Sequence, residues 1–130
     1  MKKLNGKNIN NLPFHDSKFS RITFSQNNKG TTDLILDINF CEGEFENITE
    51  YSSIIRADGS ASLLFTDCYL INCKFISNVT QRDSIDFIKI LDNASIPKDF
   101  KGQNQFEVML NSGSKIECIA KSISLIKTKT

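Results

Sequence analysis

The segment from Leu12 to Ser17 brings together three kinds of side chain that hydrolytic enzymes use. It reads LPFHDS and contains the only histidine of the chain. In such enzymes a serine attacks the substrate, a histidine removes its proton and a carboxylate orients the histidine. Here His15, Asp16 and Ser17 are neighbours, and neighbouring side chains on extended backbone point in alternating directions. They therefore do not line up as a triad, and we predict no catalytic residue and no enzyme activity.

A structural role explains the same segment. Pro13 restrains the backbone to an extended conformation, and Phe14 anchors the segment in the core. Asp16 and Ser17 form hydrogen bonds with nearby backbone N–H groups where the first strand begins. We therefore expect Pro13, Phe14, His15, Asp16 and Ser17 to form a structural motif. The alternative is a minor hydrolase that uses His15 with Asp16 or Ser17, brought together by a turn.

An acidic stretch is the second group of side chains with possible chemistry. Between Lys29 and Arg56 the chain has no Lys or Arg, while the carboxylates there are Asp33, Asp37, Glu42, Glu44, Glu46 and Glu50. One interpretation is the solvated face of a sheet, because Asp33 and Asp37 alternate with apolar residues. The other is a protein-binding surface that meets a basic partner. Its hypothetical contact residues are Glu42, Glu44, Phe45, Glu46 and Glu50.

Metal and cofactor sites are not expected. Glu42, Glu44 and Glu46 do not follow a calcium-loop pattern. The four cysteines include no Cys-x-x-Cys pair, and Cys68 and Cys73 would lie on opposite faces of a regular strand, whereas zinc needs convergent ligands. We interpret the cysteines as buried thiols in a reducing compartment.

Composition predicts one cytoplasmic domain. The chain has 130 residues, 39% of them hydrophobic, and a net charge of +1. We assign residues 1–130 to a single domain. The near-neutral charge argues against direct binding of nucleic acid or an anionic membrane. The sequence contains neither the apolar core of a signal peptide nor a membrane span, which needs ~20 apolar residues.

Alternating apolar residues predict a mainly β (α+β) fold. We expect an antiparallel sheet folded as a sandwich or a partly open barrel, with about seven or eight strands. Residues 18–25 and 31–40 form a hairpin around the turn at 26–30. The later strands are expected at 62–65, 69–76, 106–110, 116–120 and 123–126. An exposed edge strand can pair with a second copy, so the oligomeric state is left open.

The run 83–91 predicts one short helix. Asp83 or Ser84 is suited to cap it, and Phe87, Ile90 and Leu91 are spaced three and four apart, as on one helical face. A strand is the competing interpretation of so apolar a run.

The stretch 67–75 is apolar on both faces. This pattern is typical of a central strand buried between two layers. It also fits a small-ligand-binding β-barrel, whose closed cavity would be lined by Tyr69, Ile71 and Phe75.

The opening third of the chain resembles a family of proteins. The segment LPFHDS leads into Phe19 and Ile22, then a turn, then LILDI at 34–38. This layout resembles small bacterial immunity proteins of polymorphic toxin systems, including contact-dependent growth inhibition. The resemblance implies a small, cytosolic, β-rich protein that binds a cognate toxin domain, commonly a nuclease, and blocks its active site or substrate path. It assigns no binding residue, and the acidic stretch with Phe45 as apolar anchor is our own hypothesis for meeting a basic nuclease surface.

Overall fold

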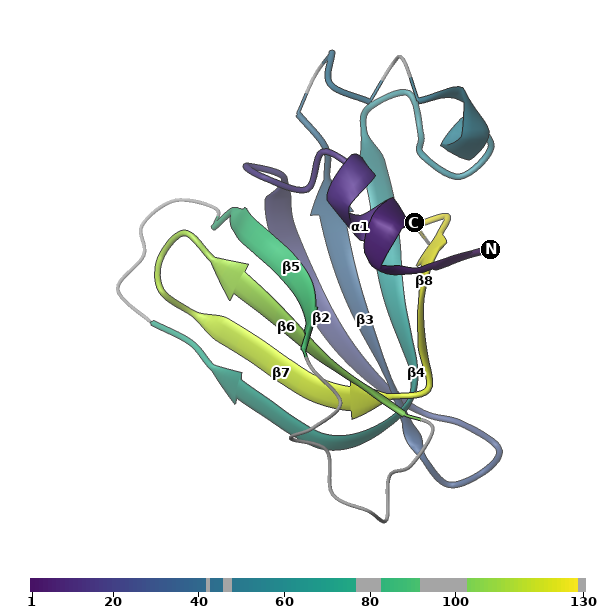
Figure 1. Cartoon of the computed structure of the whole chain (residues 1–130), viewed down its shortest axis with the longest axis vertical. Helices are drawn as coiled ribbons and strands as arrows, with labels where there is room; N and C mark the ends of the chain where they lie inside the picture. Colours follow the sequence, from purple (N-terminus) through teal and green to yellow (C-terminus); the bar gives the residue numbers. More distant parts are fainter. Residues whose placement is uncertain (42, 46–47, 77–82, 92–102, 129–130) are drawn as a thin grey trace.

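The computed structural model describes residues 1–41, 43–45, 48–76, 83–91 and 103–128. Within them the chain forms an antiparallel β-sheet that is strongly curled into a half-barrel, with one short α-helix near its beginning (Figure 1). The elements are β1 Lys2–Leu4, α1 Gly6–Asn11, β2 Lys18–Gln26, β3 Thr32–Asn39, the 3-10 helix η1 Thr49–Tyr51, β4 Ser60–Lys74, β5 Ile85–Leu91, β6 Asn104–Leu110, β7 Lys115–Ala120 and β8 Ser122–Ile126. The predicted β-rich fold and its approximate number of strands are confirmed.

Strand β4 joins the two halves of the half-barrel. Its first part pairs with β3 and β8, and its last part pairs with β7. β1 and β2 continue the first half, whereas β6 and β5 continue the second. Asp67 adopts a positive φ of 50° between the two parts, and the pairing with β7 has a register shift between Tyr69 and Asn72. These irregularities let one strand serve both halves, because bulges bend a strand.

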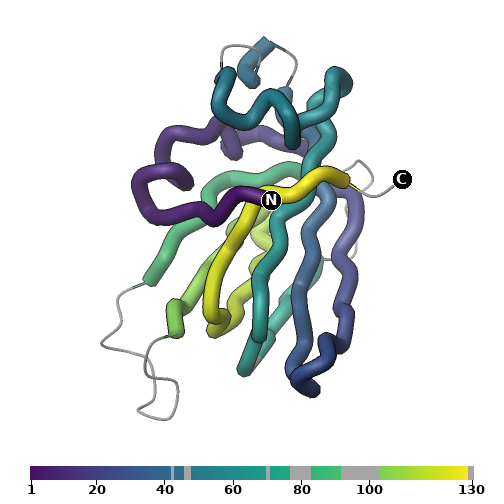
Figure 2. Tube along the Cα trace, turned by 90° about the vertical axis from the view of Figure 1, so that its right-hand side faces the viewer, coloured from purple at the N-terminus to yellow at the C-terminus, as the bar shows by residue number. Residues whose placement is uncertain are grey.

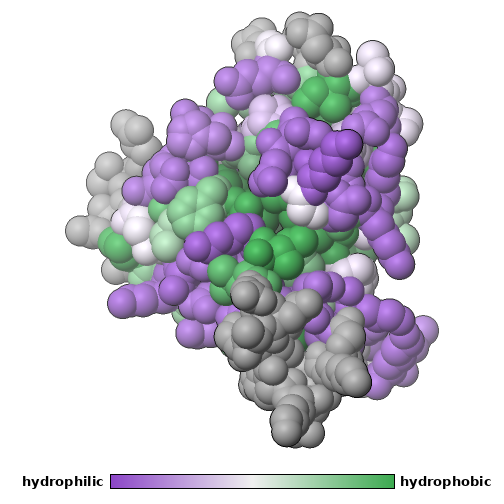
Figure 3. All heavy atoms as spheres, in the orientation of Figure 1, coloured by the Kyte–Doolittle hydropathy of each residue, from purple (hydrophilic) through white to green (hydrophobic). Residues whose placement is uncertain are grey.

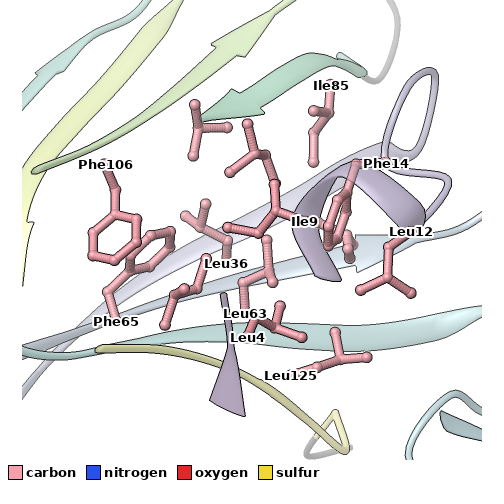
Figure 4. Close-up of a cluster of buried hydrophobic side chains, with 14 of the residues drawn as sticks. Leu4, Ile9, Leu12, Phe14, Leu36, Leu63, Phe65, Ile85, Phe106 and Leu125 are labelled. Atoms are coloured by element: carbon pink, nitrogen blue, oxygen red, sulfur yellow. The ribbon is translucent and has the colours of Figure 1, made fainter. Parts of the chain in front are cut away.

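Apolar side chains from both halves fill the interior. Leu34, Leu36 and Ile38 of β3 are at most 1% exposed, as the alternating pattern predicts. The Phe65 and Phe106 rings meet edge to face with centroids 5.5 Å apart (Figure 4). Ile9 and Leu12, from the helix region, cover one end of this core. Burial of each large side chain contributes about 1.5–3 kcal/mol.

The predicted helix at 83–91 is wrong, because Ile85–Leu91 form strand β5 paired with β6. The register is shifted between Ile85 and Phe87. This bulge explains why Ile85 and Ile88 are both buried although they are three positions apart. The bulge therefore gives this strand a spacing of buried residues that is typical of a helix.

The helix that does form is α1, which the sequence analysis did not predict. Asn5 caps it and exchanges hydrogen bonds with Asn8 in a capping box. Ile9 is its buried residue, so a single side chain holds it to the sheet. No helix within the described residues is long and apolar enough to cross a membrane.

Candidate functional site

The segment Leu12 to Ser17 lies where the edge of β2 meets the edge of β5. It connects α1 to β2, and its backbone pairs with the start of β5. The Asp16 N–H donates to the Ile85 carbonyl at 2.7 Å, and the Ile85 N–H donates to the Ser17 carbonyl at 2.8 Å. A bridge between Lys18 and Ser84 extends this contact into β2. The segment therefore fastens β2 to β5 at one end of the half-barrel.

Ser17 and Phe14 take part in the packing of this junction. The Ser17 side chain is fully buried, and its hydroxyl donates to the Pro13 carbonyl at 3.0 Å. We expected it to bond to backbone N–H groups, so its partner differs from the expectation. Phe14 is 3% exposed, with its ring centroid 5.5 Å from that of Phe40. A substrate would have no direct path to this serine.

His15, in contrast, is exposed and surrounded by oxygen atoms. Its side chain is 68% exposed, with Nε2 3.5 Å from Asp16 Oδ2 and Nδ1 3.6 Å from Asp86 Oδ1. Nδ1 donates to the Asp86 carbonyl at 2.9 Å, since a carbonyl oxygen can only accept. This hydrogen bond is the main cause that raises the pKa of His15. The Asp16 carboxylate comes next, followed by Asp86 and Glu44.

Carboxylates from three separate segments therefore act on one imidazole, because Asp16 and Asp86 lie 3.5 and 3.6 Å from it and Glu44 contributes the smallest charge effect. Asp16 follows α1, Asp86 belongs to β5, and Glu44 comes from the stretch after β3. The Cys41 thiol donates to the Asp16 carbonyl at 3.3 Å, which holds the start of the acidic stretch against the LPFHDS segment. We call His15, Asp16, Glu44 and Asp86 the His15 surface.

The residues predicted to bind a partner have different environments. Glu44 is exposed. Phe45 is half-buried, with its ring centroid 6.5 Å from that of Phe40, so part of this ring belongs to the core. Glu50 is exposed and pairs with Lys2 at 3.3 Å. Glu42 and Glu46 lie outside the described residues.

Sequence reasoning missed Asp86 and Asn111 at this site. The Asn111 amide donates to Asp16 Oδ1 at 3.2 Å and to Ser84 Oγ at 2.5 Å, which orients the Asp16 carboxylate from the turn between β6 and β7. The sequence held no signal for these contacts, because Asn111 is 95 residues from Asp16.

The His15 surface can carry out charge recognition, but its geometry does not assemble acyl-transfer chemistry. The adjacent serine is buried and bonded to Pro13, whereas a nucleophile must lie within hydrogen-bond reach of its base. Within the part of the chain that the structure describes, no group of three or more His, Cys, Asp and Glu side chains is placed to hold a metal ion. The cysteines described there are free thiols.

The residues suggested to line a ligand cavity do not all face the interior. Phe75 is 48% exposed and stacks on Phe19 with centroids 6.5 Å apart. Ile71 is half-buried against the core. Figure 3 nevertheless shows apolar side chains in the opening of the half-barrel below α1, with polar side chains around them. A further groove of about 480 Å³ lies over β2, β3, β4 and β8, where Arg21, Asp37 and Ser62 contribute to its walls.

No family model matches the chain, and neither curated proteins nor solved structures give a match.

Proposed function

We propose that this chain is an immunity protein that binds a cognate toxin domain, a nuclease with a basic surface, and blocks its active site or substrate path. The observation that carries the proposal is the His15 surface, where the Asp16 and Asp86 carboxylates lie 3.5 and 3.6 Å from one exposed imidazole and Glu44 adds its negative charge. The resemblance of the LPFHDS segment to small bacterial immunity proteins of polymorphic toxin systems supports the same role.

The charge of the His15 surface suits such a partner. It has three carboxylates against one imidazole, so it stays anionic whether or not His15 is protonated. The side chains of Asp16 and Asp86 are 60% and 45% exposed, so a docking protein can reach them. Nucleases hold phosphates with Lys and Arg. An anionic surface placed over those residues competes with the nucleic acid and speeds the encounter.

The proposed mechanism is stoichiometric and not enzymatic. Backbone pairing with β5 and the Asn111 amide hold Asp16 in place. Carboxylates held in this way lose little conformational freedom on binding, which favours affinity. A nuclease toxin acts in the compartment that holds its nucleic acid, so its inhibitor has to be present there too. We therefore propose a cytoplasmic location.

The test begins with co-expression. The chain is expressed together with the product of the neighbouring gene. We expect it to rescue the cells from toxicity and to form a complex that contains one toxin domain for each copy of the chain. The double variant Glu44→Gln/Asp86→Asn should slow association at low salt by on the order of tenfold and weaken its salt dependence.

The matched control is Glu107→Gln/Glu117→Gln. These carboxylates face each other on β6 and β7 and pair with Lys89 and Lys115. Both double variants change the net charge equally, so equal effects of the two would remove the His15 surface from the interface.

A second experiment tests the acidic stretch as a whole. Glu42, Glu44 and Glu46 are changed to Lys together, and binding to the same toxin is measured. Loss of binding is expected, since the substitutions place like charges against the basic partner. Unchanged affinity and salt dependence would exclude the stretch from the contact.

The second candidate function is small-ligand binding in the half-barrel. The apolar side chains visible in its opening favour this role (Figure 3). An apolar fluorescent probe such as anilinonaphthalene sulfonate tests it. Saturable one-to-one binding by the native protein would support a ligand site, and no binding would contradict it.

A further inference from the structure

Strand β2 leaves one long edge of the sheet without a partner strand. Along its other edge β2 pairs with β3 from Lys18 to Gln26. On the open side it meets β5 only at its start, through the Lys18–Ser84 bridge and the Phe19 N–H bonded to Asp83. Within the described residues, no strand pairs with the open side beyond that point. Figure 2 shows β2 as the outermost strand on the right of the sheet.

This edge lacks the features that usually prevent strand pairing. Natural edges are kept short or carry Lys, Pro or bulges. The register of β2 with β3 is unbroken from Arg21 to Gln26, and the irregularity lies before it, between Phe19 and Arg21. Arg21 is the only charged residue there, and its Nε donates to Asp37 Oδ2 at 2.8 Å. The other edges differ, since β1 has only three residues and β5 carries Asp86 and Lys89.

The same edge exposes apolar surface. The Phe24 residue is 54% exposed, the largest exposure among the large apolar residues of the described chain apart from Met1. Ile22 lies two positions away, so the two side chains share one face of the strand. An edge that combines free backbone groups with exposed apolar side chains favours addition of another strand.

We propose that a second copy of this chain pairs with β2, antiparallel, across a two-fold axis at Thr23. A sheet that continues across such an axis pairs residues of the same face. In this register Ile22 faces Phe24 of the other copy, and Phe24 faces its Ile22, so the exposed Phe24 and the half-buried Ile22 each gain an apolar partner.

The charges of the edge fit this register as well. Arg21 lies opposite Ser25 of the other copy, and the two Arg21 residues are four positions apart along the strand, about 13 Å. An axis at Arg21 would instead place the two guanidinium groups opposite each other, which is destabilising. An axis at Ile22 or at Phe24 would leave the Ile22–Phe24 pairs unmade.

This interface is separate from the His15 surface. Asp16 precedes β2, which begins at Lys18, and Thr23 lies five positions further along the strand, about 17 Å from Lys18. Each copy would keep its own toxin-binding surface, so a dimer would bind two toxin domains. Pairing of two chains does not require the toxin. A failed dimerisation test therefore leaves the proposed function untouched, and a failed toxin-binding test leaves the dimer untouched.

Cysteine crosslinking tests the register. Directly opposite residues in antiparallel strands have Cβ atoms about 4.5–5.5 Å apart, so Thr23→Cys brings two thiols together at the axis. Oxidised glutathione is the oxidant. The two thiols lose two protons and two electrons to form one intermolecular disulfide, while each glutathione disulfide is reduced to two glutathione thiols. We expect a covalent dimer on a denaturing, non-reducing gel.

Ser25→Cys is the matched control. It lies on the same exposed face of β2, but in the proposed register the two introduced cysteines are separated by about 13 Å, which is too far for a disulfide. The wild-type chain measures the background from its own four cysteines. Crosslinking of the two variants to the same extent would overturn the register at Thr23.

Sedimentation velocity over a range of concentrations tests the pairing itself. The wild-type chain is expected to form a dimer, and Thr23→Lys, which sets two ammonium groups opposite each other, should raise the dissociation constant at least about fivefold. Thr23 is exposed, so the urea unfolding midpoint of Thr23→Lys should stay close to that of the wild type at a concentration low enough for both chains to be monomeric. A monomeric wild-type chain at every concentration would overturn the proposal, and so would an edge that accepts only a strand of the toxin.

Discussion

Gly59 provides a sharp test of how the turn before β4 supports the acidic stretch. Gly59 has a φ of +87°, and a Cβ added to it would lie 2.7 Å from the Phe40 carbonyl oxygen and 3.0 Å from Phe45 Cε1. The Gly59 carbonyl also accepts the Phe40 N–H at 2.9 Å. The substitution Gly59→Ala therefore combines an unfavourable backbone conformation with a collision against an immobile backbone oxygen.

The two effects can be separated with Gly30. This residue has a similar φ of +81°, but an added Cβ would meet no atom within 4 Å. Gly30→Ala therefore carries only the cost of left-handed backbone, about 1–2 kcal/mol. Gly59→Ala carries a similar backbone cost, and overpacking adds about 1–3 kcal/mol. We expect the Gly59 variant to lose more stability than the Gly30 variant by that second amount.

Urea unfolding of the wild-type chain and the two variants measures the difference. The midpoints should fall in the order wild type, Gly30→Ala, Gly59→Ala, with similar slopes, because the surface exposed on unfolding hardly changes. Equal losses for the two variants would refute the reasoning that the Phe40 carbonyl and the Phe45 ring confine Gly59. In that case the turn would have room to relax.

Three further outcomes follow from the junction and the core. Ser17→Ala should reduce the free energy of unfolding by about 1 kcal/mol, because the hydroxyl loses its bond to Pro13; a urea midpoint equal to that of the wild type would contradict this. The raised pKa of His15, whose usual value is 6.5, means that the folded state binds its proton more tightly. The advantage of the wild type over His15→Gln should therefore be complete below pH 6.5 and decline as the pH rises through the raised pKa. Unfolding midpoints between pH 5 and 8.5 test this, and an advantage that increases with pH would be inconsistent with it. Phe65→Ala should cost about 3–5 kcal/mol, since it removes the ring that packs on Phe106, and calorimetry that finds an unchanged melting temperature would exclude that role.

Local alternation in the sequence predicts most strands of this fold. The expected strands at 18–25 and 31–40 correspond to Lys18–Gln26 and Thr32–Asn39, and they form the expected hairpin. The expected strands at 62–65 and 69–76 correspond to one strand, Ser60–Lys74, which ends two residues earlier than expected. Alternation predicts a strand correctly where one face of the sheet is buried and the other faces water, because apolar and polar residues then have to alternate along the strand.

Local patterns in the sequence do not predict secondary structure where contacts between distant segments determine it. The apolar spacing in 83–91 is typical of a helix, but pairing with β6 and a bulge after Ile85 make it a strand. Conversely, the helix Gly6–Asn11 has one buried residue. A single apolar residue gives no periodicity from which a helix could be predicted. The His15 surface depends on still longer contacts, since Asp86 is 71 residues from His15. The sequence indicates the acidic stretch near Glu44, but not that Asp86 would lie beside His15.

The position of β8 has a consequence for the order in which the chain can fold during synthesis. β8, Ser122–Ile126, lies between β1 and β4, so Lys2 pairs with Leu125. A ribosome that has made only the first hundred residues has synthesised β1 and β4 but not the strand that separates them. The attachment of β1 to the sheet must therefore wait for β8, and pairings over such distances form slowly. We expect β1 to join the sheet only after β8 has been synthesised, with the unfinished edges of β1 and β4 exposed to chaperones in the meantime.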